Sequence, residues 1–214
     1  QRFREATGRE PGVGMKLLML GRISYHDVYG LSFNVIAIDP RFTLGEIALR
    51  RRQTIERLER EGLIDRNRRL PLPDVFQRIA IISSEHAAGY GDFVGYLRNN
   101  PDGYGFSLTL VQAQMQGTAA ERSLCRALQL CGERADEYDA VVILRGGGGQ
   151  AELQVFDSYA VACQIARLPI PVLTGIGHLR DRTVADTVAN QSFITPTALA
   201  DFIIERSRAF ENLL

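Results

Sequence analysis

Two glycine-rich stretches decide the fold of this chain: AVVILRGGGGQAEL at residues 140–153 and PVLTGIGHLRDRTVAD at residues 171–186. Each begins with a short apolar run and passes through glycines into a segment with helical character. A short apolar strand followed at once by a helix is typical of a parallel sheet whose two faces are both covered. The two stretches therefore predict an α/β fold.

The same alternation runs through residues 78–190. Strands are expected at 78–83, 106–114, 140–145 and 170–176, and helices at 86–99, 118–134, 151–167 and 180–190. Thr195 followed by Pro196 is typical of the start of a further helix. Because right-handed crossovers join neighbouring parallel strands, we expect a mostly parallel, Rossmann-like sheet flanked by helices.

The N-terminal part has a different organisation. The apolar runs at 15–25 and 31–38 predict two strands, too few for a stable β domain, and indicate the end of a small one. Residues 44–62 have helical periodicity, and the proline-rich LPLPD at 70–74 is typical of a domain boundary. We expect a β-domain remnant, a linking helix with an extended linker, an α/β domain and the start of a helical region, at residues 1–40, 41–73, 74–194 and 195–214.

Composition limits the class of protein. The 214 residues are 45% hydrophobic and 23% charged, which is ordinary for a globular protein, and no apolar run is long enough for a membrane span. The polar start lacks the apolar centre of a signal peptide, and because the first residue is Gln1 we interpret the chain as a fragment. An odd number of cysteines without paired spacing (Cys125, Cys131 and Cys163) indicates reduced thiols and a cytoplasmic protein.

Charge is distributed unevenly, although the net charge is zero. Residues 1–70 contain 14 Lys or Arg and 9 Asp or Glu, whereas residues 71–214 contain 11 and 16. All basic residues except Lys16 are arginines, which suit bidentate phosphate contacts and stacking on bases. This favours a polyanionic partner for the N-terminal part, although genomic base composition alone can also produce many arginines.

Polar and glycine-rich residues follow three of the predicted strands. They are SSEHAAGYGD at 83–92, RGGGG at 145–149 and GIGHLRD at 175–181. Ligands of an open parallel sheet bind at the carboxyl ends of its strands, so we expect these turns to meet at one edge and form the functional site. No strand is followed by G-x-G-x-x-G or by G-K-[ST], which argues against dinucleotide and P-loop sites.

The turn at 145–149 has the residue types of an anion site. Glycine lets backbone N–H groups approach an anion, the following helix N-terminus adds favourable partial charge, and Arg145 adds a planar cation. The residues expected to hold a phosphate group are Arg145, Gly146, Gly147 and Gly148. The alternative, equally supported by the residue types, is that the glycines only make a tight turn.

His178 and Asp181 follow the last of these strands. Being three residues apart at the start of a helix, they share a face, and a carboxylate beside an imidazole orients it for proton transfer. A purely structural His178 is the alternative. Asp92, in the helix after the first strand, is either a carboxylate that binds a metal or acts as a base, or a solvated helix residue.

In their order along the chain, these segments resemble the large subunit of exodeoxyribonuclease VII. The resemblance runs over about residues 12–206 and rests on the motifs Arg-Gly-Gly-Gly, Gly-His-x-x-Asp and Thr-Pro-[ST]-Ala, found here at 145–148, 177–181 and 195–198. It implies a hydrolase, an exonuclease that degrades single-stranded DNA from either end to oligonucleotides by hydrolysing phosphodiester bonds.

The resemblance also implies the site residues. The catalytic set would be Asp92, Arg145, His178 and Asp181, and the phosphate-binding or DNA-binding set Gly146, Gly147, Gly148, Gly177 and Thr183. Four positions depart from the family pattern: Leu179, Gln150, Ala151 and Gln154. No obligatory cofactor is expected, and a divalent metal such as Mg²⁺, if one binds, would be held by Asp92 or Asp181.

Further parts and partners follow from the resemblance. Residues 1–40 would be the last strands of an N-terminal OB-type domain, and the helical region that binds the small subunit would be largely absent. Single-stranded DNA and the small subunit are the expected partners, with no membrane. Two alternatives remain: a non-catalytic DNA-binding or scaffolding module, and a nucleotide or sugar-phosphate enzyme that uses the same edge of the sheet.

Overall fold

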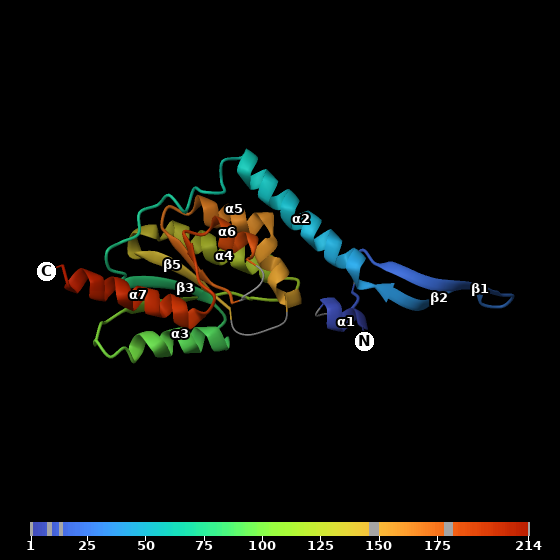
Figure 1. Ribbon diagram of the computed structural model, residues 1–214, viewed down its shortest axis with the longest axis horizontal. Coiled ribbons are helices and arrows are strands. Elements are labelled where there is room, and N and C mark those ends of the chain that lie inside the picture. Colours follow the sequence, from blue (N-terminus) through green and yellow to red (C-terminus); the bar gives the residue numbers. More distant parts are fainter. Residues whose placement is uncertain (1, 8–9, 13–14, 146–149, 178–181, 214) are drawn as a thin grey trace. The chain divides into compact units, whose positions relative to one another are not determined.

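The computed structural model describes residues 2–7, 10–12, 15–145, 150–177 and 182–213 (Figure 1). Contacts divide the chain into two compact units. The hairpin unit consists of residues 1–53 with 149–151, and the sheet unit consists of residues 54–148 with 152–214. Among the described residues, no helix combines the length and apolar character needed to cross a membrane.

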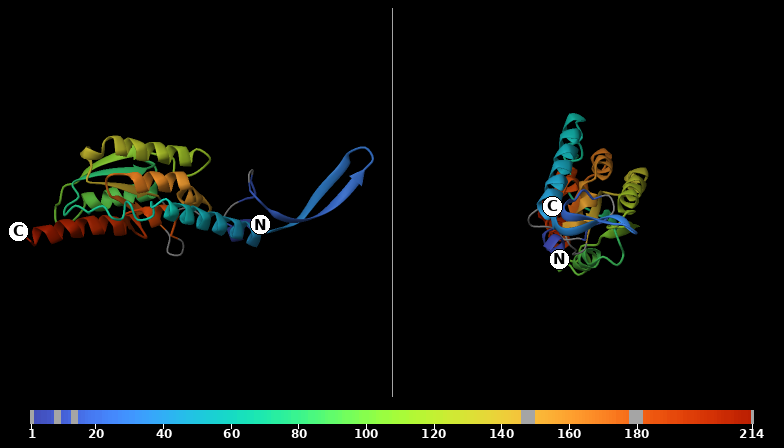
Figure 2. Two further views of the ribbon diagram at one scale, coloured as in Figure 1. Left: turned by 90° about the horizontal axis from the view of Figure 1, so that it is seen from above. Right: turned by 90° about the vertical axis from the view of Figure 1, so that its right-hand side faces the viewer.

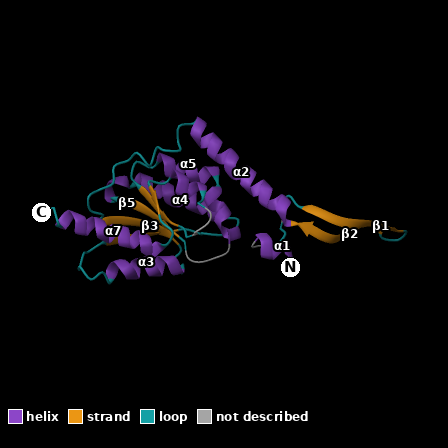
Figure 3. Cartoon of the chain, in the orientation of Figure 1, coloured by secondary structure: helices purple, strands orange, loops and turns teal. Residues whose placement is uncertain are grey.

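The sheet unit is built on a parallel five-stranded sheet (Figure 3). Its strands are β3 (Arg78–Ser83), β4 (Ser107–Gln112), β5 (Ala140–Leu144), β6 (Val172–Gly175) and β7 (Gln191–Ser192). Their order is β4-β3-β5-β6-β7, and each neighbouring pair is parallel. The expected α/β fold with a parallel sheet is therefore confirmed.

Helices cover both faces of this sheet (Figure 1, Figure 2). Helices α3 (Ala88–Arg98) and α7 (Pro196–Glu211) lie on one face, and α4 (Ala120–Glu133), α5 (Tyr159–Arg167) and α6 (Val184–Val188) lie on the other. Successive residues of a strand point to opposite faces, so Ile79 and Ile81 pack with α3 and α7, whereas Ala80 and Ile82 pack with α4 and α5. This double burial explains why the strands are almost entirely apolar.

Two predicted helices differ from the structure. The helix expected at 151–167 is divided into a 3₁₀ helix, η2 (Gln150–Asp157), and α5. Ser158 separates them because its backbone is extended and its hydroxyl accepts the N–H of Ala160 at 3.1 Å, which caps α5. In the region expected to be helical at 180–190, α6 covers only Val184–Val188, since Thr183 is its N-cap.

Three short elements were not expected from the sequence. They are α1 (Arg2–Thr7), the 3₁₀ turn η1 (Ala135–Glu137) and the edge strand β7. Each is only two to six residues long. Periodicity needs a longer window than this to be recognised.

The hairpin unit contains the two strands that the sequence predicted. Strands β1 (Leu18–His26) and β2 (Gly30–Asp39) pair antiparallel and meet at a tight turn, where Gly30 has a φ of +73°. Apolar side chains along the hairpin are exposed, among them Leu20, Ile23 and Leu31. Helix α2 (Pro40–Arg60) follows directly, and Asp39 accepts the N–H of Arg41 at 2.9 Å where it begins. That the hairpin is the end of an OB-type domain stays a prediction.

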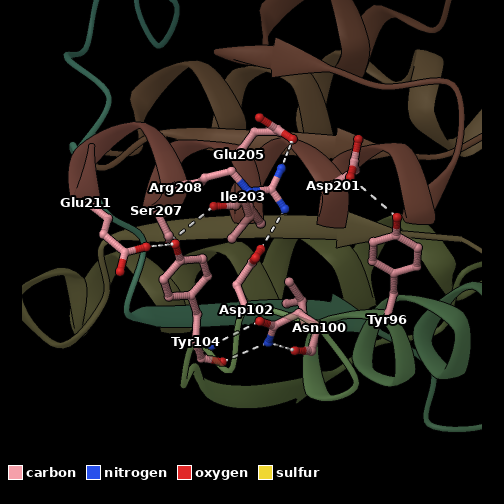
Figure 4. A network of polar contacts seen from close by, with 11 residues as sticks. Tyr96, Asn100, Asp102, Tyr104, Asp201, Ile203, Glu205, Ser207, Arg208 and Glu211 are labelled. Carbon is pink, nitrogen blue, oxygen red and sulfur yellow. Dashed lines mark hydrogen bonds and ion pairs between the residues drawn. The ribbon is translucent and has the colours of Figure 1, made fainter. Parts of the chain in front are cut away.

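Helix α7 is fixed to α3 and the loop after it by polar contacts (Figure 4). Three side-chain pairs make these contacts: Tyr96 with Asp201 at 3.3 Å, Asp102 with Arg208 at 2.6 Å, and Tyr104 with Glu211. The loop itself is closed by Asn100, whose amide oxygen accepts the N–H of Tyr104 at 2.9 Å. The C-terminal half of α7 is therefore held on the sheet unit by hydrogen bonds and by its apolar face.

The N-terminal end of α7 fits between α3 and the sheet. Thr195 caps the helix by accepting the N–H of Ala198 at 3.0 Å, and Pro196 occupies the first turn. A Cβ on Gly175 would lie 3.3 Å from Cα of Pro196, and a Cβ on Gly89 would lie 2.9 Å from its Cγ. The close approach of three segments thus requires small residues at positions 89 and 175.

The Gly89→Ala substitution tests this packing. The added methyl would lie 2.9 Å from the carbonyl carbon of Arg145 and closer still to its oxygen, and backbone cannot give way cheaply. We expect Gly89→Ala to lower the free energy of unfolding by about 2 kcal/mol. Gly95→Ala in the same helix is the control, because nothing lies within 4 Å of its Cβ, and it should be neutral or stabilise by up to about 1 kcal/mol. Equal thermal unfolding midpoints for the two variants would contradict the packing.

The Tyr104–Glu211 contact predicts a loss of stability at high pH. Its hydrogen bond to the Glu211 carboxylate raises the pKa of Tyr104 to about 12. Because the pKa of an unfolded tyrosine is about 10, the stabilisation is complete below that pH and is lost as the pH rises from about 10 towards 12. We expect the unfolding midpoint of Tyr104→Phe to be lower at pH 8 and to fall less steeply above pH 10. Tyr25→Phe, which alters an exposed ring of the hairpin unit, is the control and should follow the parent curve.

Candidate functional site

The carboxyl ends of three adjacent strands form one edge of the sheet. Strands β3, β5 and β6 are neighbours, and they end at Ser83, Leu144 and Gly175. The buried hydroxyl of Ser83 donates to the carbonyl of Leu144 at 3.0 Å, and the N–H of Arg145 donates to the carbonyl of Gly175 at 3.4 Å. The turns that follow these strands therefore start side by side, as the sequence predicted.

Arg145 is the residue directly after β5, and only 5% of it is exposed. Its backbone lies between Gly175 of β6, which accepts its N–H, and Gly89 of α3, which packs against its carbonyl. Its guanidinium group thus extends from a main chain that neighbouring elements hold on two sides. A guanidinium in such a position presents several N–H donors in a fixed plane, which suits contacts with a phosphate group.

Asp92 lies in the first turns of α3, three residues after Gly89. Its residue is exposed, and α3 begins at the same edge because it follows β3. Since residues three apart lie on adjoining sides of a helix, Asp92 is one step along α3 from the glycine that contacts Arg145. The structure therefore brings Asp92 and Arg145 to one edge of the sheet.

Several of the predicted site residues lie outside the described residues: Gly146, Gly147, Gly148, His178 and Asp181. The described residues that flank them are Arg145 on one side and Gly177 and Arg182 on the other. Gly177 has a φ of +79°, a conformation that glycine adopts readily and other residues rarely adopt. Glycine at position 177 therefore suits the backbone conformation directly before His178.

Thr183 lies at the same edge but is buried, with 3% of it exposed. Its hydroxyl accepts the N–H of Asp186 at 3.1 Å, and its own backbone N–H donates to the Asp186 carboxylate at 2.9 Å, which together form a capping box for α6. The same carboxylate accepts the hydroxyl of Thr174 at 2.6 Å. In this structure Thr183 therefore fixes the end of the turn to β6 and α6.

Sequence reasoning missed three residues that shape the edge: Ser83, Gln112 and Asp186. The Gln112 side chain accepts the N–H of Glu85 at 3.2 Å and joins the turn after β3 to β4. The spacing Thr-x-x-Asp at 183–186 is a capping signal that could have identified Asp186. Nothing local distinguishes Ser83 or Gln112, because their partners are distant in sequence.

Asp92 and Asp181 are the residues expected to hold a divalent metal if one binds. Among the described residues, no three His, Cys, Asp or Glu side chains come together as a metal site would require. Asp181 lies outside these residues. The described carboxylates therefore do not form a metal cage on their own.

A groove of about 480 Å³ lies beside this edge of the sheet. The described residues that line it are Arg68, Gly177, Arg182, Asp186, Asn190, Gln191, Ser192, Phe193 and Ile194. They come from the loop after α2, from the turn between β6 and α6, and from β7 with its flanking residues. The groove is thus continuous with the turn that precedes His178.

Comparison with known proteins gives a consistent result. The family model described as exonuclease VII, large subunit, matches residues 63–214, which is more than half of the chain. An exodeoxyribonuclease 7 large subunit of Deinococcus radiodurans is 38% identical over 210 residues, covering 95% of this chain and 50% of that protein. Large subunits of Lactobacillus delbrueckii subsp. bulgaricus and Acaryochloris marina are each 36% identical, covering 90% and 91% of this chain and 42% and 46% of those proteins.

The chain spans about half the length of the curated relatives it matches. The family model covers the sheet, its flanking helices and the turns at its carboxyl edge. The chain belongs to the family of exonuclease VII large subunits.

Proposed function

We propose that this chain carries the catalytic site of an exodeoxyribonuclease that hydrolyses phosphodiester bonds of single-stranded DNA. The observation that carries the proposal is that three adjacent strands end at one sheet edge, where Arg145 and the start of α3 with Asp92 lie, and Gly177 directly precedes His178 in the chain. The names of the relatives support the reaction class. Cleavage from either end to oligonucleotides is the finer part of the proposal.

The reaction would be an in-line attack of water on a backbone phosphate. The water oxygen forms a new P–O bond, the P–O bond to the departing nucleotide breaks, and the departing oxygen receives a proton. His178, oriented by Asp181, would transfer a proton. Asp92 would act as a second acid or base, or as a ligand if a divalent ion such as Mg²⁺ takes part.

Arg145 and nearby backbone N–H groups would stabilise the charge that develops on the phosphate. The burial of Arg145 supports this role, because a cation in a site with little water interacts more strongly with an anion than one in solvent. Its confined backbone supports it further, since a donor held in place needs little reorganisation during the reaction. A guanidinium also matches two phosphate oxygens at once.

The hairpin unit would contribute to DNA binding. Tyr25 and Tyr29 are 71% and 84% exposed, so their rings are available for stacking on bases. His26 lies beside Tyr29, with ring centroids 4.9 Å apart. The proposal treats this hairpin as the end of an OB-type domain, because such domains combine exposed aromatic rings with basic residues.

A small subunit would be the protein partner. The relatives are named as large subunits, which implies a complex with a smaller one. In our proposal the helical region that starts with α7 leads to the part that binds the small subunit. The complex would act in the cytoplasm.

The His178→Ala substitution tests the catalytic role. With the protein assembled with a small subunit of its family, we expect hydrolysis of labelled single-stranded DNA to fall at least about 100-fold, because proton transfer is lost. Binding of the same strand should stay within about twofold, since the arginines that contact phosphates are unchanged.

His86→Ala is the matched control. His86 lies in the turn after β3, its side chain is 87% exposed, and it contacts only the neighbouring Glu85 carboxylate at 3.3 Å among the described residues. We expect this variant to retain the parent rate. Undiminished cleavage by the His178→Ala protein, with folding confirmed by circular dichroism, would refute the proposed mechanism.

A further inference from the structure

The groove beside β7 contains two arginine side chains that converge. Arg182 donates to the carbonyl of Asp186 at 3.5 Å and to the hydroxyl of Ser192 at 2.9 Å. Arg68 donates to the carbonyl of Thr187 at 2.6 Å. These carbonyls belong to consecutive residues of α6, and both arginine side chains line the groove.

Carboxylates neutralise this pair only in part. Arg68 forms an ion pair with Asp65 at 3.2 Å, and among the described residues no carboxylate pairs with Arg182. Asp186, whose carbonyl accepts from Arg182, has its carboxylate engaged by Thr174 and by the N–H and hydroxyl of Thr183. Arg182 therefore keeps N–H groups for an anion, and two neighbouring cations favour one.

Two apolar side chains, Phe193 and Ile194, also line the groove. Ile194 is 52% exposed, and Phe193 is half-buried beside it. The Phe193 ring packs against Phe202 of α7, with centroids 5.0 Å apart, which holds it in place. An aromatic ring and an exposed aliphatic side chain together offer a surface on which a nucleobase can stack.

One wall of the groove is formed by β7, the strand at the edge of the sheet. Strand β7 pairs with β6 on one side and is the last strand in the order β4-β3-β5-β6-β7. Gln191 in this strand is exposed, so its amide adds donors and acceptors along the wall. The groove thus combines cations, amide groups and an apolar platform within about 480 Å³, a size within the range of small-ligand sites.

We propose that this groove binds one nucleotide of the DNA strand next to the bond that is cut. Its phosphate lies at Arg182 and Arg68, and its base stacks on Phe193 and Ile194. The inference rests on the proposed function, because the groove leads from the turn that precedes His178. The DNA strand would then run along the edge of the sheet formed by β7.

Equilibrium binding of a fluorescein-labelled oligo-dT tests the groove. The measurements use the His178→Ala protein assembled with its small subunit, across a range of salt concentrations. We expect Arg182→Gln to bind about eightfold more weakly at 0.1 M salt and to lower the slope of log K against log salt by about one, because one phosphate contact is lost. Arg182→Lys, which keeps the charge, should retain most of the affinity and of the slope.

Arg98→Gln is the matched control for charge. Arg98 is exposed in the last turn of α3, at the end of that helix far from the carboxyl edge of the sheet. The Arg98→Gln substitution removes the same charge as Arg182→Gln but at a site away from the groove. We therefore expect its affinity and its salt slope to stay close to those of the parent. Equal losses in Arg98→Gln and Arg182→Gln would mean that only net charge matters and would overturn the proposal.

The Ile194→Ala substitution tests the apolar lining of the groove. We expect it to weaken binding about threefold with no change in the salt slope, since it removes stacking surface and no charge. A strand carrying 5-iodouracil should crosslink on irradiation to the peptide that contains Phe193. Parent affinity in Arg182→Gln together with no crosslink to this peptide would overturn the proposal.

The same samples are also run on a denaturing gel. If the parent protein cuts the strand and all variants bind it equally, the groove proposal is wrong and the proposed function stands. If the His178→Ala protein cuts the strand at the parent rate, the proposed mechanism is wrong. The difference in affinity between Arg182→Gln and Arg98→Gln would still test the groove.

Discussion

The alignment of β5 with its two neighbours is the constraint on which the site depends. Val142 of β5 lies opposite Ile81 of β3 and Leu173 of β6, and all three strands run in the same direction. Both faces of these strands are buried under helices, so a slip by one residue would turn every apolar side chain towards the wrong cluster. The register is therefore strongly specified, and with it the place where each strand ends. Because the ends coincide, three turns open at one edge.

Close packing at that edge then fixes the residues that leave it. Gly89 contacts the carbonyl of Arg145, Gly175 accepts its N–H, and both glycines contact Pro196 of α7. Helix α7 is held at its other end by Arg208 and Glu211. A helix anchored at both ends thus serves as a support for the backbone at the start of the Arg145 turn. This gives the edge a rigid base at Arg145.

The arginines have more varied environments than the uneven charge of the sequence indicated. In the hairpin unit Arg41 is paired with Asp39 at 2.7 Å. In the sheet unit Arg57 lies 3.7 Å over the ring of Tyr159 and pairs with Glu61 at 2.9 Å. Such paired, exposed arginines contribute little to a continuous basic path. Arg182, from the half of the chain with an excess of acidic residues, lines the groove together with Arg68 from the other half.

The sequence by itself determined the alternation of strands and helices, because apolar periodicity and capping residues act between near neighbours. It also determined the edge of the sheet at which polar residues gather, since that follows from the direction of each strand. Only the tertiary structure decided the strand order, the burial of Arg145 and the need for glycine at position 89. Only the tertiary structure brings Arg68 to the same helix as Arg182, which follows it by more than a hundred residues: both donate to carbonyls of α6. These features depend on which distant segments pack together, and the spacing of residues along the chain carries no direct record of that packing.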